Sequence, residues 1–348
     1  MRLLASPIYR QDIERVAQLP IDWDQLKGTA LALSGASGMI GSFLVDVLMA
    51  RNAEGLGCTV QALVRDRAAA EQRFAGYGAD LVLTTADVCK GPLEASADYV
   101  IHAASNTHPV AYAADPISTI TTNIDGTRNM LDLAVRSQAR RAVFLSTVEV
   151  YGESREAQQW FRETDLGYID CNTLRAGYPE SKRAGEALCQ AFRAQYGLSV
   201  TIARLPRIYG PTLRKSDTKA LSQFLFRAAS AQNIVLKSDG TQFYTYCHVA
   251  DAVSAILICL LSGEDGEAYN VADPSGDVRL RDLAELVAGV AGTHVVYDLP
   301  GGLEQRGYSA ATRAVMDGTK LARLGWRPLY SLEEGVRRTL AVWAEMTP

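Results

Sequence analysis

The chain has 348 residues, of which 48% are hydrophobic and 21% charged, and its formal net charge is −4. A chain of this length can hold one large α/β domain or two lobes with an ample core. The weak negative charge, without any basic block, gives no reason to expect nucleic acid or an anionic membrane as a partner.

The cysteines and histidines are widely dispersed, and no CxxC pair occurs, so we expect no metal site and a reducing compartment. The longest apolar stretch, 252–261, is too short to span a bilayer. The first twenty residues carry charges throughout and lack the apolar core of a signal peptide. We therefore expect a soluble, cytoplasmic protein.

The order of the predicted elements indicates an α/β fold. Residues 1–28 are predicted to form an N-terminal helical extension. From there, short apolar runs alternate with helical patterns, which is typical of a parallel sheet with crossover helices. The runs predict strands buried on both faces, at 29–34, 58–64, 80–86, 99–104, 141–147 and 199–205. The clearest helical patterns lie at 40–50, 116–137 and 179–196.

The alternation breaks after Leu205. We predict a Rossmann-type doubly wound parallel sheet in 29–205, with a returning strand and helix at about 243–262. Residues 206–242 and 263–348 are predicted to form a smaller C-terminal α/β lobe that binds the substrate.

The run LALSGASGMIG places Gly35, Gly38 and Gly41 between an apolar strand and a helix. Glycines at such a turn let backbone N–H groups approach a pyrophosphate at a helix N-terminus. The run predicts a dinucleotide-binding loop, because the strand before it and the helix after it are both present.

The second strand ends in VQALVRDR, where NAD-binding folds usually place an acid for the ribose hydroxyls. Arg65 stands at the first position after the strand, which would suit a 2′-phosphate and favours NADP over NAD. The alternative is that Asp66 binds the ribose of NAD.

Tyr178 and Lys182 lie four residues apart in YPESK, on one face of a predicted helix. An unperturbed tyrosine has a pKa of about 10, too high for a base at neutral pH. A nearby ammonium, together with an oxidised nicotinamide, favours the phenolate. The pair therefore predicts a tyrosine base whose pKa is lowered by Lys182.

Taken together, the motifs resemble the extended short-chain dehydrogenase/reductase family, the NAD(P)-dependent sugar-nucleotide epimerases, dehydratases and decarboxylases. The resemblance covers most of the chain from about Thr29. It includes, in order, GASGMIG, Asp87-Val88, VIHAAS, NIDGTRNML with Asn123, STVEVYG, YPESK, ARLPRIYGP, HVADAV and DGTKLARLGWRP.

The resemblance implies roles for particular residues and a tightly bound cofactor. Thr147 would hydrogen-bond the reacting sugar hydroxyl, Tyr178 would take its proton, and Lys182 would hold the cofactor ribose. Asn123 would brace the sheet. A homodimer through the helices at 116–138 and 179–196 is implied as well. The implied cofactor-binding residues are Gly35, Ser37, Gly38, Met39, Ile40, Gly41, Arg65, Asp87, Val88, Ala103, Ala104, Ser105, Tyr178, Lys182, Leu205 and Pro206.

Enzymes of this group oxidise the sugar at C4, and the resulting 4-ketone opens routes to epimerisation, dehydration or decarboxylation. Glu149, within the run FLSTVEVYG, bears on the choice, because strand alternation would put it on the same side as Thr147. It could act as a base on the 4-keto intermediate. Alternatively, it forms a salt bridge with Arg175 or Arg207. Val148 replaces the acid of Thr-Asp-Glu dehydratases, which argues against a 4,6-dehydratase.

The candidates for substrate contacts are Arg175, Arg207, Tyr244 and Arg313. Arg207 and Tyr244 depart from the pattern, because they replace the family's usual Asn and Arg. The run LRAGYPESKR resembles that of uronate decarboxylases, so Arg175 could meet a carboxylate or phosphate. Arg313 is a candidate diphosphate contact. The expected substrate is a nucleotide-diphosphate sugar. A net NADPH-dependent carbonyl reductase and a non-catalytic cofactor-sensing protein remain as alternatives.

Overall fold

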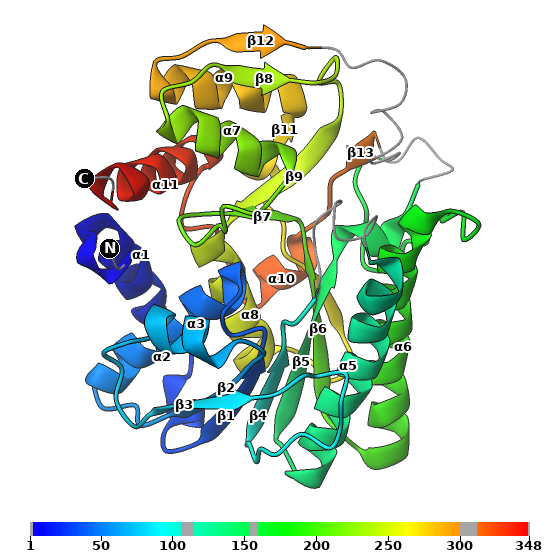
Figure 1. The fold of residues 1–348 in the computed structure, drawn as a ribbon. Coiled ribbons are helices and arrows are strands. Elements are labelled where there is room, and N and C mark those ends of the chain that lie inside the picture. Colours follow the sequence, from blue (N-terminus) through cyan, green and yellow to red (C-terminus); the bar gives the residue numbers. More distant parts are fainter. Residues whose placement is uncertain (1–2, 106–114, 154–158, 299–311, 347–348) are drawn as a thin grey trace.

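The computed structural model of the chain describes residues 3–105, 115–153, 159–298 and 312–346; the remainder, including parts of the predicted extension and lobe, lies outside the described residues. Its centre is a parallel seven-stranded sheet in the order β10-β6-β5-β4-β1-β2-β3 (Figure 1). The strands are β1 Ala30–Ser34, β2 Thr59–Val64, β3 Leu81–Thr85, β4 Tyr99–His102, β5 Arg141–Thr147, β6 Val200–Leu205 and β10 Ala268–Asn270. All six predicted strands lie in this sheet, and the predicted Rossmann-type fold is confirmed.

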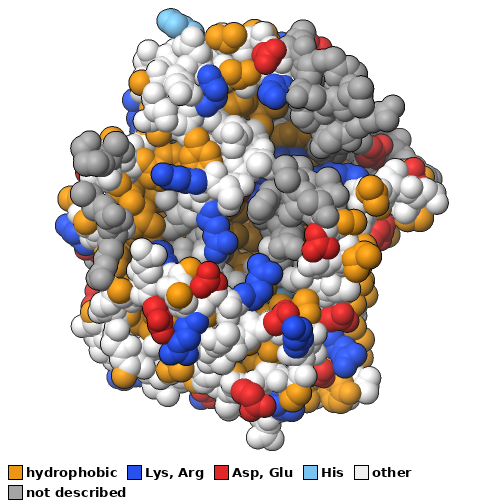
Figure 2. All heavy atoms as spheres, viewed as in Figure 1, with side chains coloured by type: hydrophobic (Ala, Val, Ile, Leu, Met, Phe, Trp, Pro, Cys, Tyr) orange, Lys and Arg blue, Asp and Glu red, His pale blue; other side chains and the backbone are white. Residues whose placement is uncertain are grey.

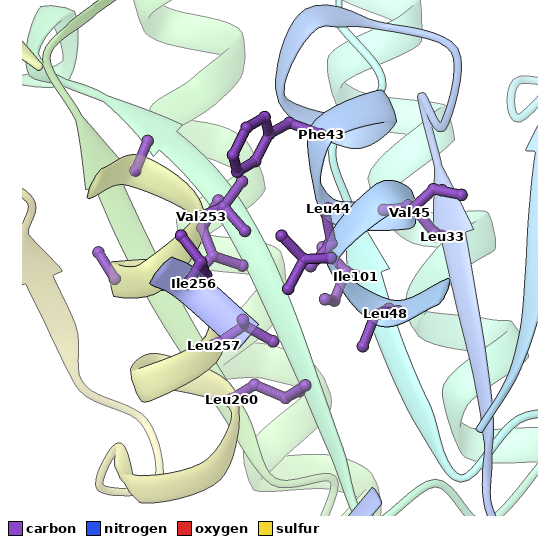
Figure 3. Packing of buried hydrophobic residues seen from close by; sticks show 14 of the residues in the cluster. Leu33, Phe43, Leu44, Val45, Leu48, Ile101, Val253, Ile256, Leu257 and Leu260 are labelled. Carbon is purple, nitrogen blue, oxygen red and sulfur yellow. The ribbon is translucent and has the colours of Figure 1, made fainter. Parts of the chain in front are cut away.

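Helices cover both faces of the sheet. The helices α5 Pro116–Arg136 and α6 Gly177–Tyr196 lie on one face, and α2 Met39–Ala53 and α8 Val249–Ser262 on the other (Figure 1). Figure 3 shows side chains of α2 and α8 converging over the strands. Leu33 and Ile101 point to this side, whereas Phe144 and Ile202 belong to the core beneath α5 and α6. Burial on both faces explains why the strands read as continuous apolar runs.

The N-terminal extension is anchored to the cofactor domain by a buried polar cluster. It comprises η1 Leu3–Ala5, α1 Pro7–Ala17 and η2 Trp23–Leu26, and α3 Arg67–Arg73 lies nearby. The fully buried Tyr9 hydroxyl donates to the Asp46 carboxylate at 2.5 Å. Arg73 of α3 pairs with the same carboxylate, and the Tyr77 hydroxyl donates to it at 2.8 Å. Three elements are thereby joined around one buried charge.

The remaining elements form an upper lobe with its own core (Figure 1). Strand β9 Phe243–His248 pairs with β7, β11 and β13, and β8 pairs with β12. The prediction that a strand at 243–262 returns to the Rossmann sheet is therefore wrong, because β9 lies in the lobe sheet. Helix α8 from the same range does pack against the main sheet. The edge strand of the main sheet next to β6 is β10. The other lobe elements are β7 Arg207–Tyr209, α7 Ala220–Ala229, β8 Ile234–Leu236, η5 Pro274–Gly276, β11 Asp277–Arg279, α9 Leu280–Ala291, β12 Val295–Tyr297, β13 Arg313–Ala314 and α11 Leu332–Met346. Helix α10 Thr319–Arg323 packs on β10, and its Leu321 lies in the core shared with α2 and α8.

Within the described part of the chain, none of the helices combines the length and the apolar character that crossing a bilayer requires.

Candidate active site

The glycine loop packs so closely that side chains are excluded from it. Gly35 has φ of 68°, and a Cβ there would lie 2.8 Å from the carbonyl of Ala103. A Cβ at Gly41 would lie 2.3 Å from the Gly35 carbonyl oxygen. The loop therefore presents backbone rather than side chains at the start of α2, as a pyrophosphate cradle requires. The residues present fit the predicted dinucleotide.

A cavity of about 1340 Å³ opens beside this loop. Most predicted cofactor residues form its walls, namely Gly35, Ser37, Gly38, Arg65, Asp87, Val88, Ala103, Ala104 and Ser105. Met39, Ile40 and Gly41 form the first turn of α2 without lining it. Leu205 and Pro206, at the end of β6, are buried and do not line it either. The cavity thus brings together residues that follow β1, β2, β3 and β4, the edge where doubly wound folds bind ligands.

The acid that competes with Arg65 for the ribose is already partly engaged. The Asp66 carboxylate accepts a hydrogen bond from the Ala69 backbone N–H at 2.9 Å and caps α3. Arg65 is exposed in the cavity wall. A cation is therefore available beside the cofactor's predicted ribose position.

Thr147 and Tyr178 meet at the carboxyl edge of the sheet. Thr147 ends β5, and Tyr178 stands in the first turn of α6, where only 7% of its surface is exposed. Burial raises the pKa of Tyr178 well above 10, and the negative charge of Glu149 raises it further. Hydrogen bonds with Thr147 and Ser105 and the charge of Arg175 act in the opposite direction. The side chains of Ser105, Thr147, Glu149 and Arg175 therefore all lie close enough to Tyr178 to affect its pKa.

Lys182 is held one turn further along α6. Only 2% of its surface is exposed, and its Nζ donates to the Leu145 carbonyl at 2.8 Å, 4.7 Å from the centre of the Phe144 ring. Burial lowers the pKa of Lys182 to about 7, although the charge of Glu186 opposes this shift. Among the described residues, burial of the phenol outweighs every favourable partner and raises the pKa of Tyr178. A lowering of this pKa by Lys182 together with an oxidised nicotinamide stays a prediction.

Glu149 does not lie on a strand, contrary to the prediction. Strand β5 ends at Thr147, and residues Val148–Tyr151 form the 3₁₀ turn η3. The prediction that strand alternation puts Glu149 on the same side as Thr147 is therefore wrong. The turn nevertheless leaves Glu149 near Tyr178. Arg175, in η4 Leu174–Ala176, donates to the Glu149 carboxylate at 2.9 Å. The Arg175 side chain is 31% exposed and that of Glu149 is 26% exposed, so the pair is partly open to solvent.

The predicted substrate residues of the lobe lie on adjacent strands of its sheet. The Arg207 guanidinium stacks on the Tyr244 ring, 3.4 Å from the ring centre, and its buried Nη1 has no hydrogen-bond partner among the described residues. Arg313 on β13 is exposed, and its Nε donates to the Gln159 carbonyl at 2.8 Å. Stacking therefore fixes the Arg207 guanidinium and leaves its Nη1 donor without a partner among the described residues. The Arg313 guanidinium, by contrast, already donates to a backbone carbonyl.

Asn123 connects the elements around Tyr178. The Ser105 hydroxyl donates to its side-chain oxygen at 2.7 Å, and its amide donates to the Ser181 hydroxyl at 2.9 Å. The Ser181 hydroxyl in turn donates to the Tyr178 carbonyl. Asn123 thus ties the end of β4 and α5 to the first turn of α6, beyond the bracing of the sheet that was predicted.

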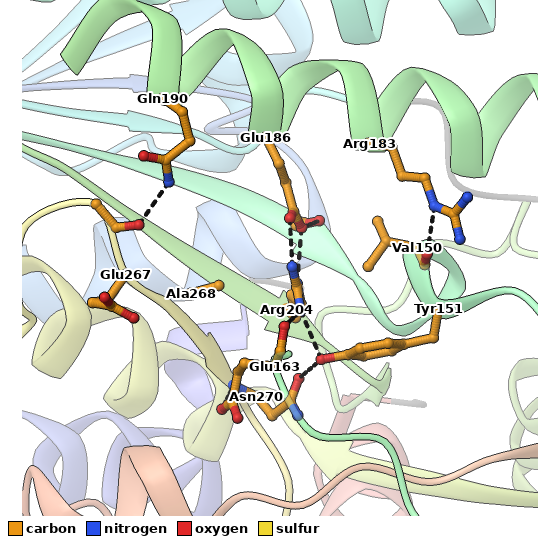
Figure 4. A network of polar contacts seen from close by, with 12 residues as sticks. Val150, Tyr151, Glu163, Arg183, Glu186, Gln190, Arg204, Glu267, Ala268 and Asn270 are labelled. Carbon is orange, nitrogen blue, oxygen red and sulfur yellow. Dashed lines mark hydrogen bonds and ion pairs between the residues drawn. The ribbon is translucent and has the colours of Figure 1, made fainter. Parts of the chain in front are cut away.

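A second network behind the site was not predicted. The Ser146 hydroxyl donates to Glu186 at 2.5 Å. Arg204 pairs with the same carboxylate at 2.7 Å (Figure 4). Arg204 also donates to the Tyr151 hydroxyl, which donates to Asn270 at 2.6 Å. In the sequence, the one indication of this network is the acidic residue Glu186, one helical turn after Lys182. The network fixes β5, β6 and β10 to α6.

The lobe contributes a cavity wall that the sequence did not indicate. Its members are Pro211, Thr212, Leu213, Arg214, Lys215, Gln223, Phe226, Ala229, Ser230 and Trp343. The Arg214 guanidinium donates to the Ser37 carbonyl in the glycine loop at 2.6 Å. No motif marks these residues, because only the packing of the lobe on the sheet brings them to the cofactor cleft.

The parallel sheet and the glycine loop define a Rossmann fold suited to a dinucleotide, and Thr147, Tyr178 and Lys182 stand at the carboxyl edge of its sheet. The sequence profile of the NAD dependent epimerase/dehydratase family matches residues 31–272, and the chain belongs to this family. It is an enzyme of the sugar-nucleotide-modifying kind, one that uses a nicotinamide dinucleotide to oxidise its substrate transiently.

Curated relatives with similar sequences are decarboxylases. The chain is 32% identical to UDP-glucuronic acid decarboxylase 5 of Arabidopsis thaliana, over 88% of this chain and 86% of the relative. It is 30% identical to UDP-glucuronic acid decarboxylase 1 of Danio rerio, over 89% of this chain and 71% of the relative.

Solved structures with the same fold include both dehydratases and epimerases. One is the dTDP-glucose 4,6-dehydratase of Streptomyces venezuelae with NAD bound, with 25% identity, a TM-score of 0.76 and coverage of 91% and 97% of the two chains. Another is the UDP-glucose 4-epimerase of Thermotoga maritima with UDP-glucose, with 22% identity, a TM-score of 0.77 and coverage of 91% and 99%.

Proposed function

We propose that the protein decarboxylates a nucleotide-linked uronic acid, with UDP-glucuronate as the substrate. The observation that carries this proposal is the ion pair of Glu149 and Arg175 beside Tyr178. A guanidinium next to the reacting centre suits a substrate carboxylate, since it can bind both oxygens at once. The decarboxylase relatives support the same choice.

Val148 supports decarboxylation over dehydration. Its side chain is 4% exposed and packs in the core of the lobe. Loss of a sugar hydroxyl requires an acid to protonate the leaving group. Neither the chemistry of valine nor its position provides one.

The first chemical step falls to Thr147, Tyr178 and Lys182. Thr147 holds the C4 hydroxyl and Tyr178 accepts its proton. A bound nicotinamide would supply the reversible acceptor for the hydride of C4. Lys182, one turn along the same helix, holds the cofactor ribose. The positive charge of the oxidised cofactor favours the phenolate that burial disfavours.

The second step uses Arg175 and Glu149. Arg175 turns from Glu149 to the C6 carboxylate of the substrate. The 4-ketone makes this group a β-keto acid, so the C5–C6 bond breaks and its electron pair moves into a C4 enolate. Once Arg175 has turned away, a proton from solvent reaches C5 by way of the Glu149 carboxylate. Carbon dioxide leaves, and hydride return completes the product.

Product mass is the direct test of this proposal. Purified protein incubated with UDP-glucuronate should release a UDP-sugar lighter by one carbon dioxide, without a net change in nicotinamide absorbance. An unchanged mass would indicate epimerisation, and loss of water would indicate dehydration. Net consumption of NADPH would establish the alternative of a carbonyl reductase and refute the proposal.

Substitution of Glu149 separates the two steps. Glu149→Gln should still reduce the bound cofactor when UDP-glucuronate is added, seen as nicotinamide absorbance, but product formation should fall by about 10²–10⁴-fold. Glu180→Gln, a neighbouring carboxylate paired with Arg183, is the matched control and should retain turnover. Unimpaired turnover of Glu149→Gln would show that this residue is structural.

The finer assignments are part of the same proposal. We propose that residues 29–205 bind the cofactor and that the C-terminal lobe binds the nucleotide sugar, with Arg207, Tyr244 and Arg313 as contacts. The free donor of Arg207 beside Tyr244 supports this. Arg65 supports NADP as the cofactor form, which competitive titration of NAD⁺ against NADP⁺ would test.

A homodimer and a cytoplasmic location are proposed as well. The dimer would form through α5 and α6. Ile117 on α5 is 74% exposed and Tyr196 on α6 is 53% exposed, so each helix presents one large apolar side chain that a partner could cover. Light scattering of the purified protein measures the oligomeric state.

A further inference from the structure

The cofactor cavity has a second wall that comes from the lobe. The lobe segment Pro211–Lys215 follows β7 and faces the glycine loop across the cavity. Trp343 of α11 donates to the Pro211 carbonyl at 2.9 Å, and Leu213 is 9% exposed. The segment is therefore held in place by the lobe, while its two basic residues are exposed in the cavity.

Arg214 reaches the loop that cradles the cofactor. Its Nη2 donates to the Ser37 carbonyl at 2.6 Å and lies 3.4 Å from the Ser37 hydroxyl. A guanidinium has five N–H donors, and these contacts use only one of its nitrogens. The remaining donors are available for an anion lying against the glycine loop.

Thr212 gives an independent sign of a ligand. Its side chain is 8% exposed and lines the cavity, yet its hydroxyl has no hydrogen-bond partner among the described residues. Leaving a buried polar group unpaired costs about 1–3 kcal/mol. A bound phosphate oxygen next to this hydroxyl would remove that cost.

The cavity wall carries more basic side chains than free carboxylates, because its two aspartates already accept hydrogen bonds from the backbone. Arg65 lines the cavity from the sheet side, facing the same space as Arg214 and Lys215. The carboxylate of Asp66 caps α3, and that of Asp87 accepts from the Cys89 backbone N–H. Figure 2 shows Lys and Arg side chains gathered on this face between the upper and lower parts of the molecule.

We propose that Thr212, Arg214 and Lys215 of the lobe, together with Arg65, form a phosphate subsite that holds the dinucleotide from across the cleft. The proposal rests on the dinucleotide cofactor assigned above and not on the sugar substrate. The phosphate is either the pyrophosphate or the 2′-phosphate of the adenosine ribose. Because Arg214 also bonds the glycine loop, the subsite closes over the cofactor and slows its release.

The test is cofactor binding to the full-length protein freed of cofactor. NAD⁺, NADP⁺ and ADP-ribose are titrated by calorimetry into the wild type, Arg214→Ala and Thr212→Val. Loss of charge-assisted hydrogen bonds should weaken binding by about tenfold or more. An equal loss for NAD⁺ and NADP⁺ identifies the pyrophosphate, and a loss confined to NADP⁺ identifies the 2′-phosphate.

Arg67→Ala is the matched control, because it removes the same charge from an exposed site two residues from Arg65 that does not line the cavity. It should bind all three ligands like the wild type, and dissociation of bound cofactor should be faster only in the Arg214 variant. Wild-type affinities and dissociation rates in both Arg214→Ala and Thr212→Val would overturn the subsite. No sugar nucleotide enters the experiment, so its failure is separate from a failure of the proposed decarboxylation.

Discussion

The buried ammonium of Lys182 makes a quantitative prediction about stability and pH. Burial lowers its pKa from the ordinary value of 10.5 to about 7 in the folded chain. Between these two values the unfolded chain binds more protons at this site than the folded chain, so stability rises with pH across the window. Below pH 7 the residue is charged in both states, and the cost of burying the charge is felt in full.

The size of the effect follows from the shift. One pKa unit corresponds to about 1.36 kcal/mol, so the full cost is about 5 kcal/mol at low pH. Between pH 6 and pH 9 the wild type should recover about 2–3 kcal/mol of this cost as Lys182 loses its proton. Lys182→Met removes the titrating group and keeps an apolar stem of similar length over the Phe144 ring.

The assay is urea unfolding of cofactor-free wild type and Lys182→Met at pH 6, 7.5 and 9. The difference in unfolding free energy between the two proteins cancels every other titrating group. The variant should be the more stable protein at pH 6, and its advantage should shrink as pH rises. Parallel stability curves would show that Lys182 titrates alike in both states, which would refute the argument from burial.

Two further predictions concern the catalytic step and the glycine loop. Tyr178→Phe should lower turnover by about 10²–10⁴-fold while leaving cofactor binding intact, as measured by product mass and calorimetry; normal turnover would show that the phenol is not the base. Gly41→Ala should weaken cofactor binding at least tenfold, because its Cβ would lie 2.3 Å from the Gly35 carbonyl oxygen. The matched control is Gly289→Ala in α9, where the new Cβ meets nothing within 4 Å. That variant should bind cofactor normally and gain about 0.4–1 kcal/mol of stability, and a loss of binding in it would remove the steric explanation.

Local patterns in the sequence predicted the cofactor half of the molecule well. The six strands and the glycine turn depend on burial and on backbone geometry within a few residues, so they can be read from short runs. The strand at 243–248 was assigned to the wrong sheet, because an apolar run does not reveal its pairing partners. The lobe wall at Arg214 was not foreseen for a similar reason, since it depends on how two distant parts of the chain pack.

The sequence pattern singles out Glu149 as a candidate, but it predicts the wrong local structure for this residue. Alternation placed it on a strand with Thr147, but the strand ends at that threonine and a 3₁₀ turn follows. The salt bridge with Arg175 was one of the alternatives left open, and the structure contains it. The sequence indicates Glu149 and Arg175 as candidate partners. It does not give the distance between them, because that distance depends on where η4 packs.

An ion pair with Arg175 and a catalytic role are compatible explanations for Glu149. While Arg175 holds the carboxylate, the bonded oxygen of Glu149 is occupied by the guanidinium. A substrate carboxylate that draws Arg175 away leaves this oxygen free close to Tyr178, where it can act on the 4-keto intermediate. A sugar without a carboxylate offers Arg175 no second partner, so the resting pair would persist. The same salt bridge that stabilises the empty site would thus confine the second step to substrates with an acid at C6.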